Sequence, residues 1–197
     1  LNPGKTIHNL VTCPEELGSG TPNAASGRFF AELSQFGEKV PKGEKLSNEC
    51  DVKTYYFDAR DENGNILNHR AALVDKLKEL EEEPSVIGNL VIGSKSGIED
   101  NVTIIPRSPG NPIWAIDMCQ LRAPSDLVNR LIGLGAMVMI TGSKFYQAPP
   151  YCGALLVPKK FLDTLPQDRD ASVYEPFAKI FSKNDIPAAL PWMRKHF

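Results

Sequence analysis

The sequence predicts an α/β fold, a three-layer α/β/α sandwich with a mainly parallel sheet. Short apolar runs rich in Val and Ile alternate along the chain with segments of helical periodicity. Most connections between these runs are long enough for the crossovers that parallel neighbours require. The chain has 197 residues, enough for one sizeable hydrophobic core. We therefore expect a single domain over residues 1–197.

The composition is that of an ordinary globular chain. Its formal net charge is −2 and 42% of its residues are hydrophobic, so no basic excess indicates nucleic acid or a membrane surface as a partner. No apolar run reaches the roughly 18 residues that a membrane span needs. The first residues lack the features of a signal or transit peptide. These observations favour a cytoplasmic protein that binds neither nucleic acid nor membrane.

The cysteines and histidines are scattered. The four cysteines form no Cys-x-x-Cys pair, and no histidine stands at ligand spacing from another. This pattern predicts free thiols in a reducing compartment and no metal site.

The first half of the chain is expected to contain three strands and two helices. Strands are predicted over 6–13, 52–57 and 85–93, and helices over 23–33 and 69–83. The second helix is the clearest, because Leu73, Leu77 and Leu80 fall on one face.

The second half contains a predicted strand–helix–strand unit. An apolar run over 113–116 ends in Asp117, residues 125–134 have helical periodicity, and a second run over 136–141 leads to Lys144. A crossover through the helix makes the two strands parallel, so Asp117 and Lys144 are expected at the same edge of the sheet. A further strand is predicted over 153–157. The turn before it, over 147–151, is too short for a helical crossover, so this strand should run antiparallel to its predecessor.

Lys144 is the residue on which the functional interpretation depends. A lysine desolvated between strands becomes a usable amine nucleophile for Schiff-base chemistry. The alternative is a solvated charge at a strand end, which is the commoner situation on spacing alone. The acid at the end of the preceding strand, Asp117, favours the chemical interpretation. Lys95 also follows a predicted strand, but it has no acid partner of this kind and ranks below Lys144.

The order of these motifs resembles a known family. Residues 117–120 read Asp-Met-Cys-Gln, residues 141–144 read Thr-Gly-Ser-Lys, and a Gly-Ala-Leu-Leu strand follows. Together they resemble the large domain of fold-type I pyridoxal-phosphate enzymes, and most of all the class V aminotransferase and cysteine-desulfurase branch. By this resemblance the chain is an incomplete large domain, because an upstream phosphate loop and a C-terminal small domain are not recognisable in it.

The resemblance implies a role for each residue of the two motifs. Lys144 would bind pyridoxal 5′-phosphate as a Schiff base, and Asp117 would pair with the pyridine nitrogen and strengthen the ring as an electron sink. Gln120 would hydrogen-bond the 3′ oxygen of the ring, and Thr141 and Ser143 would contact the phosphate. The branch often has Ser-x-His-Lys where this chain has Thr-Gly-Ser-Lys, so the phosphate contacts depart from the family pattern.

The function implied is that of a pyridoxal-phosphate-dependent transferase or lyase acting on an amino acid or amine, homodimeric when full length and inactive as an isolated fragment. The alternative is a non-catalytic relative or binding module that kept the fold. The presence of both Asp117 and Lys144 disfavours it, because a fold alone needs neither. A nucleotide-binding α/β protein ranks third, since the Gly-x-x-x-x-Gly-Lys-Ser/Thr spacing is absent.

Overall fold

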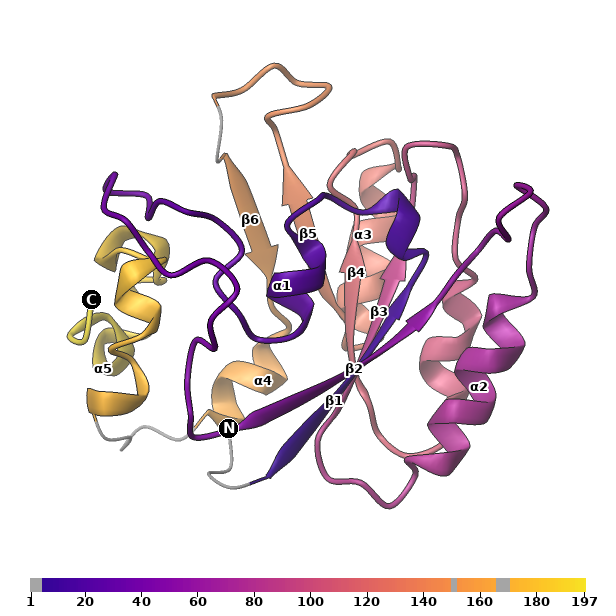
Figure 1. Ribbon diagram of the computed structural model, residues 1–197, viewed down its shortest axis with the longest axis horizontal. Coiled ribbons are helices and arrows are strands. Elements are labelled where there is room, and N and C mark those ends of the chain that lie inside the picture. Colours follow the sequence, from indigo (N-terminus) through magenta and orange to yellow (C-terminus); the bar gives the residue numbers. More distant parts are fainter. Residues whose placement is uncertain (1–4, 150–151, 166–170) are drawn as a thin grey trace. The chain divides into compact units, whose positions relative to one another are not determined.

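The computed structural model describes residues 5–149, 152–165 and 171–197 (Figure 1). The chain divides into two compact units. Unit 2 comprises Ile7–Gly18 and Lys53–Asp163, and it holds most of the sheet and all the predicted site residues. Unit 1 comprises Ser19–Val52 and the described parts of the two ends of the chain.

Six strands form one sheet in the order β2-β1-β3-β4-β5-β6. They are β1 (Thr6–Thr12), β2 (Asp51–Phe57), β3 (Val86–Val91), β4 (Ile113–Asp117), β5 (Met137–Thr141) and β6 (Gly153–Leu156). Strands β1, β3, β4 and β5 run parallel to one another, and β6 is antiparallel to β5. An α/β fold with a mostly parallel sheet is therefore confirmed, as is the antiparallel last strand. The arrangement is compatible with an α/β/α sandwich.

Two helices of unit 2 share a hydrophobic core with the sheet (Figure 1). They are α2 (His69–Glu79), capped by the side chain of Asn68, and α3 (Ser125–Gly133), which connects β4 to β5. Their most buried side chains are Leu73, Leu77 and Leu131, none more than 2% exposed. The predicted leucine face of α2 and the predicted strand–helix–strand unit are both confirmed.

One close contact fixes the packing of β3 on β4. Gly88 lies opposite Trp114 in the register of the two strands, and the indole is only 3% exposed. A β carbon at Gly88 would lie 2.4 Å from the indole ring. The missing side chain therefore provides the space that the buried indole occupies.

The predicted helix over 23–33 is wrong over most of its length. Helix α1 spans only Thr21–Ala25. Gly27 follows it with a φ of +66°, a left-handed conformation that commonly ends helices. Arg28 then pairs with Lys45 in an isolated antiparallel bridge. The helical periodicity of the sequence was overridden by this local pairing within unit 1.

The remaining helical elements are short. They are η1 (Pro14–Glu16), η2 (Val102–Arg107), α4 (Lys159–Thr164), η3 (Ala171–Val173), η4 (Phe177–Lys179), η5 (Lys183–Asp185) and α5 (Pro191–Arg194). Among the described residues, no helix is long and apolar enough to cross a membrane. Residues 150 and 151 of the predicted turn lie outside the described residues.

We expect Gly88→Ala to lower the free energy of unfolding by about 1–3 kcal/mol, because the added methyl group overpacks the indole of Trp114. Urea denaturation measures the change. Gly133→Ala is the matched control, since a β carbon there meets no neighbouring atom. The control should leave the free energy of unfolding unchanged or raise it by up to about 1 kcal/mol. Equal effects of the two substitutions would contradict this account of the packing.

Candidate functional site

Asp117 and Lys144 stand at the carboxyl ends of neighbouring parallel strands. Asp117 is the last residue of β4 and lies opposite Met139 of β5, and Lys144 follows shortly after the end of β5. The Asp117 carboxylate is half-buried and accepts a hydrogen bond of 2.9 Å from the backbone N–H of Cys119. The two residues thus stand at the carboxyl edge of the sheet, as the sequence predicts.

The thiol of Cys119 is influenced by both charges. Burial, and then the charge of Asp117 and a hydrogen bond to it, raise the pKa of Cys119 to about 12, whereas the charge of Lys144 lowers it. A thiol with such a pKa is protonated at neutral pH and is a poor nucleophile.

The Lys144 side chain is exposed to solvent. In the described part of the chain its ammonium group has no hydrogen-bond or ion-pair partner. The structure therefore places this lysine at a strand end in solvent, which is the alternative that its spacing left open. The exposed ring of Phe145 follows it, with the guanidinium of Arg122 at 4.4 Å from the ring centroid.

The hydroxyl groups of Thr141 and Ser143 hold the turn after β5. Thr141 donates to the carbonyl of Cys152 at 2.5 Å, and the two hydroxyl oxygens lie 2.8 Å apart. Since Thr141 has one hydroxyl hydrogen, Ser143 is the donor in that pair. Both hydrogens are used within the turn, so Ser143 must rotate before it can donate to a phosphate. Gln120 is half-buried, and its side chain has no partner among the residues described.

No protein-family model matches this chain, and no curated protein matches it in sequence. The resemblance to pyridoxal-phosphate enzymes therefore stays a prediction based on the residues described above.

Residues of the loop after β3 form hydrogen bonds to the segment that follows β1. The ammonium of Lys95 donates to the carbonyl of Leu17 at 2.8 Å. The backbone N–H and hydroxyl of Ser96 donate to the two carboxylate oxygens of Glu16 at 2.8 and 2.5 Å. Although burial acts in the opposite direction, the hydrogen bonds from Ser96 and Ser94 and the charge of Lys95 hold the pKa of Glu16 below its ordinary value. Lys95 is therefore a poor rival to Lys144.

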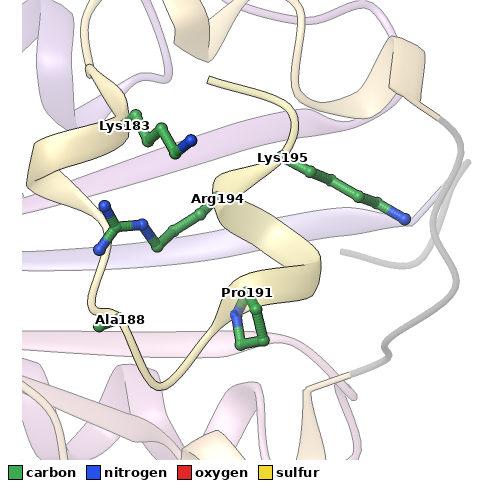
Figure 2. A pocket seen from close by; sticks show the side chains of 5 residues that line it. All are labelled: Lys183, Ala188, Pro191, Arg194 and Lys195. Atoms are coloured by element: carbon green, nitrogen blue, oxygen red, sulfur yellow. The ribbon is translucent and has the colours of Figure 1, made fainter.

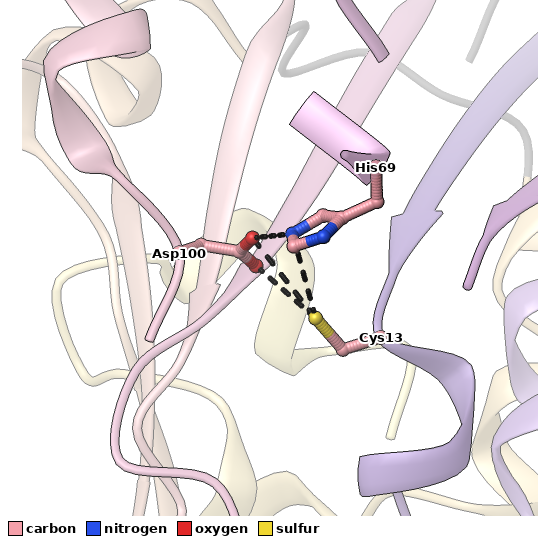
Figure 3. Close-up of side chains that lie close together, drawn as sticks. All are labelled: Cys13, His69 and Asp100. Atoms are coloured by element: carbon pink, nitrogen blue, oxygen red, sulfur yellow. Dashed lines mark hydrogen bonds and ion pairs between the residues drawn. The ribbon is translucent and has the colours of Figure 1, made fainter. Parts of the chain in front are cut away.

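A second cluster, formed by Cys13, His69 and Asp100, lies elsewhere in unit 2 (Figure 3). His69 Nε2 lies 2.7 Å from Asp100 Oδ1 and 3.8 Å from Cys13 Sγ. The sulfur is 4.0 and 3.9 Å from the two oxygens of Asp100. Cys13 is fully buried, and only 14% of the His69 side chain and 4% of the Asp100 side chain are exposed.

The other oxygen of Asp100 is also satisfied. Its Oδ2 accepts hydrogen bonds from the backbone N–H of Val91, at 2.7 Å, and from the hydroxyl of Thr12. Burial, followed by the charges of Asp100 and Glu15, raises the pKa of Cys13 to about 12. The thiol is therefore protonated at neutral pH.

The spacing of cysteines and histidines in the sequence did not predict this cluster. His69 stands 56 residues from Cys13 and 31 residues from Asp100, which is no ligand motif. The available signal was positional, because Cys13 directly follows β1 and His69 opens α2. The absence of a sequence motif therefore did not exclude a cluster in space.

Unit 1 contains a basic hollow of about 430 Å³ (Figure 2). It is lined by Lys183, Ala188, Pro191, Arg194 and Lys195. None of the predicted site residues lines it. Its basic side chains come from short helical segments, and none of them was predicted to take part in catalysis or cofactor binding.

We expect Glu16→Gln to lower the free energy of unfolding by about 1–2 kcal/mol at neutral pH, because hydrogen bonds to a charged acceptor are lost. A carboxyl with a lowered pKa in the folded state contributes stability above the pKa of free glutamate and loses it as the pH falls through the folded-state value. The difference in free energy of unfolding between Glu16→Gln and the parent should therefore become smaller at acidic pH. Urea denaturation at neutral and acidic pH measures it. The exposed Glu62, changed to Gln, is the control, and its loss should change the free energy of unfolding at neutral pH by no more than about 0.5 kcal/mol.

Proposed function

We propose that this chain is the large-domain part of a pyridoxal-phosphate-dependent enzyme that acts on an amino acid or amine, with Lys144 as the residue that attaches the cofactor. The observation that carries the proposal is the placement of Asp117 and Lys144 at the carboxyl ends of adjacent parallel strands, Asp117 as the last residue of β4 and Lys144 shortly after β5. Open α/β sheets bind ligands outside the carboxyl ends of their strands, where these two residues stand.

The side chains at this edge fit the cofactor. The Lys144 amine is accessible and unpartnered in the described part of the chain, as covalent attachment requires. The Asp117 carboxylate accepts from the backbone N–H of Cys119 and is also hydrogen-bonded by the Cys119 thiol, so a protonated ring nitrogen would replace or share the contact with the thiol. The Gln120 amide can donate to a ring oxygen.

Each residue then has a defined task. The cofactor, when bound, supplies an electron sink for the bond broken at the substrate. Asp117 would hold the proton on the ring nitrogen by its negative charge. Lys144 would attach the cofactor and, as a free amine, would serve as the base that moves the proton at the substrate's α carbon. Ser143 would have to rotate out of its bond to Thr141 to reach the phosphate.

A non-catalytic binding module is the second candidate. The commitment of both turn hydroxyls to local hydrogen bonds favours it, because a phosphate site needs free donors. A lysine exposed at a strand end is also an ordinary surface feature. The two candidates differ in whether Lys144 forms a covalent bond.

Lys144→Ala should abolish covalent attachment of pyridoxal phosphate to the full-length protein. The cofactor is added to the parent protein and to the variant, and a visible absorbance band is recorded for each. Borohydride reduction followed by peptide mapping then locates the label. In the parent protein we expect the label on Lys144. Lys95→Ala is the matched control, an exposed strand-end lysine whose loss should leave the label in place. A label spread over surface lysines, or no band, would refute the proposal and support the binding module.

Asp117→Asn should slow proton exchange at the substrate α carbon by roughly 10²–10³-fold, because an electrostatic partner of the reacting ring is lost. Exchange of the α hydrogen with solvent deuterium, followed by NMR over a panel of amino acids, measures the rate. Attachment to Lys144 should persist in this variant. Asp126→Asn alters an exposed acid on α3 and is expected to leave exchange unchanged. An Asp117→Asn variant as fast as the parent would remove Asp117 from the mechanism.

A further inference from the structure

We propose that Cys13, His69 and Asp100 form a binding site for a divalent transition metal ion of the zinc type. The ligands would be the Cys13 thiolate, the Nε2 atom of His69 and the Oδ1 atom of Asp100. The site uses none of the residues assigned to pyridoxal phosphate. It can therefore exist whether or not that function is correct.

Three separate segments bring the ligand atoms together (Figure 3). Cys13 comes from the end of β1, His69 from the first turn of α2, and Asp100 from the loop after β3. A thiol, an imidazole and a carboxylate are the three side-chain types that bind zinc in proteins. Their convergence in a largely buried place is the first requirement of a metal centre.

The distances suit a tetrahedral ion. Metal–ligand bonds of about 2.0–2.3 Å at tetrahedral angles place neighbouring ligand atoms roughly 3.3–3.6 Å apart. The sulfur stands 3.8 Å from His69 Nε2 and 4.0 Å from Asp100 Oδ1, and the latter two atoms are 2.7 Å apart. An entering ion would therefore part the imidazole from the carboxylate, replace their hydrogen bond, and draw the thiol inward by a few tenths of an ångström.

The backbone of Cys13 is held in an unusual conformation. Its φ and ψ are 50° and 51°, the left-handed region that residues other than glycine seldom occupy. Two backbone hydrogen bonds of 2.9 Å maintain it, one from the Cys13 N–H to Phe57 and one from the Glu16 N–H to the Cys13 carbonyl. Strained residues of this kind concentrate at functional sites. Here the turn connects β1 to η1 while the thiol stays beside His69 and Asp100.

The carboxylate is oriented as a ligand would be. Hydrogen bonds from Val91 and Thr12 both reach Oδ2, which leaves Oδ1 directed at the imidazole. Supporting hydrogen bonds of this kind orient metal-binding carboxylates and are a regular part of metal sites.

A thiol nucleophile activated by a His–Asp pair fits this geometry less well. In such a relay the acid binds one ring nitrogen and the nucleophile the other. Cys13 and Asp100 instead approach the same atom, His69 Nε2, while the buried Nδ1 atom has no partner in the described part of the chain. Cys13 is also fully buried, so a substrate cannot reach its sulfur.

The ligand set also selects the ion. Thiolate and imidazole favour zinc and similar transition metals over magnesium and calcium, which prefer oxygen ligands. Three protein ligands leave the fourth tetrahedral position for water. On binding, the Cys13 proton passes to solvent and the proton of the neutral imidazole resides on Nδ1, because metal ligands must be deprotonated.

Cobalt titration tests the proposal. Co²⁺ is added to the metal-free full-length protein without pyridoxal phosphate, and the near-ultraviolet band of a cobalt–thiolate bond is followed. We expect one equivalent to bind and Zn²⁺ to displace it. Cys13→Ser should abolish the band, whereas Cys119→Ser should retain it. Cys119 is the matched control, a half-buried thiol beside the carboxylate of Asp117.

His69→Gln provides a second test that leaves the buried thiol in place. It should weaken cobalt binding at least about tenfold, while circular dichroism verifies that the variant is folded. The proposal is overturned if the parent gives no thiolate band, if the band survives in Cys13→Ser, or if folded His69→Gln binds cobalt as tightly as the parent.

Discussion

The buried carboxylate of Asp100 is the interaction on which the arrangement of unit 2 depends. A charge removed from water is costly unless its oxygens are hydrogen-bonded. Asp100 meets this requirement by accepting from Val91 on β3, Thr12 on β1 and His69 on α2. One side chain thus joins two adjacent strands and the helix that leads into the second of them. Loss of the carboxylate would remove the hydrogen bonds that link these three elements.

Both candidate sites follow from the parallel pairing of the strands. Because β1, β3, β4 and β5 run in the same direction, the residues that follow them gather at one edge of the sheet. Cys13 stands there after β1, Asp117 at the end of β4 and Lys144 after β5. The packing of Trp114 against Gly88 belongs to the same constraint, since it fixes β4 beside β3. The sheet therefore provides a rigid base, and the loops at its edge carry the reactive groups.

The extent to which the sequence anticipated the structure differs between elements. Leu73 and Leu77 were identified as core residues, because helical periodicity places them on one face of α2. The same reasoning failed over 23–33, where Gly27 and the bridge from Arg28 to Lys45 interrupt the pattern. Periodicity predicts which face a helix would bury. It does not reveal a competing local pairing.

The sequence by itself determined the order of strands along the chain and the placement of Asp117 and Lys144 at the ends of two connected strands. Hydrophobic periodicity and crossover length suffice for this, because both are local properties of the chain. Only the tertiary structure decided that Lys144 is exposed and that the hydroxyls of Thr141 and Ser143 bond to each other. It alone brought Cys13 to His69, which lies 56 residues away in the chain. Such contacts arise when separate elements pack on a common sheet, and no local pattern of residues encodes them.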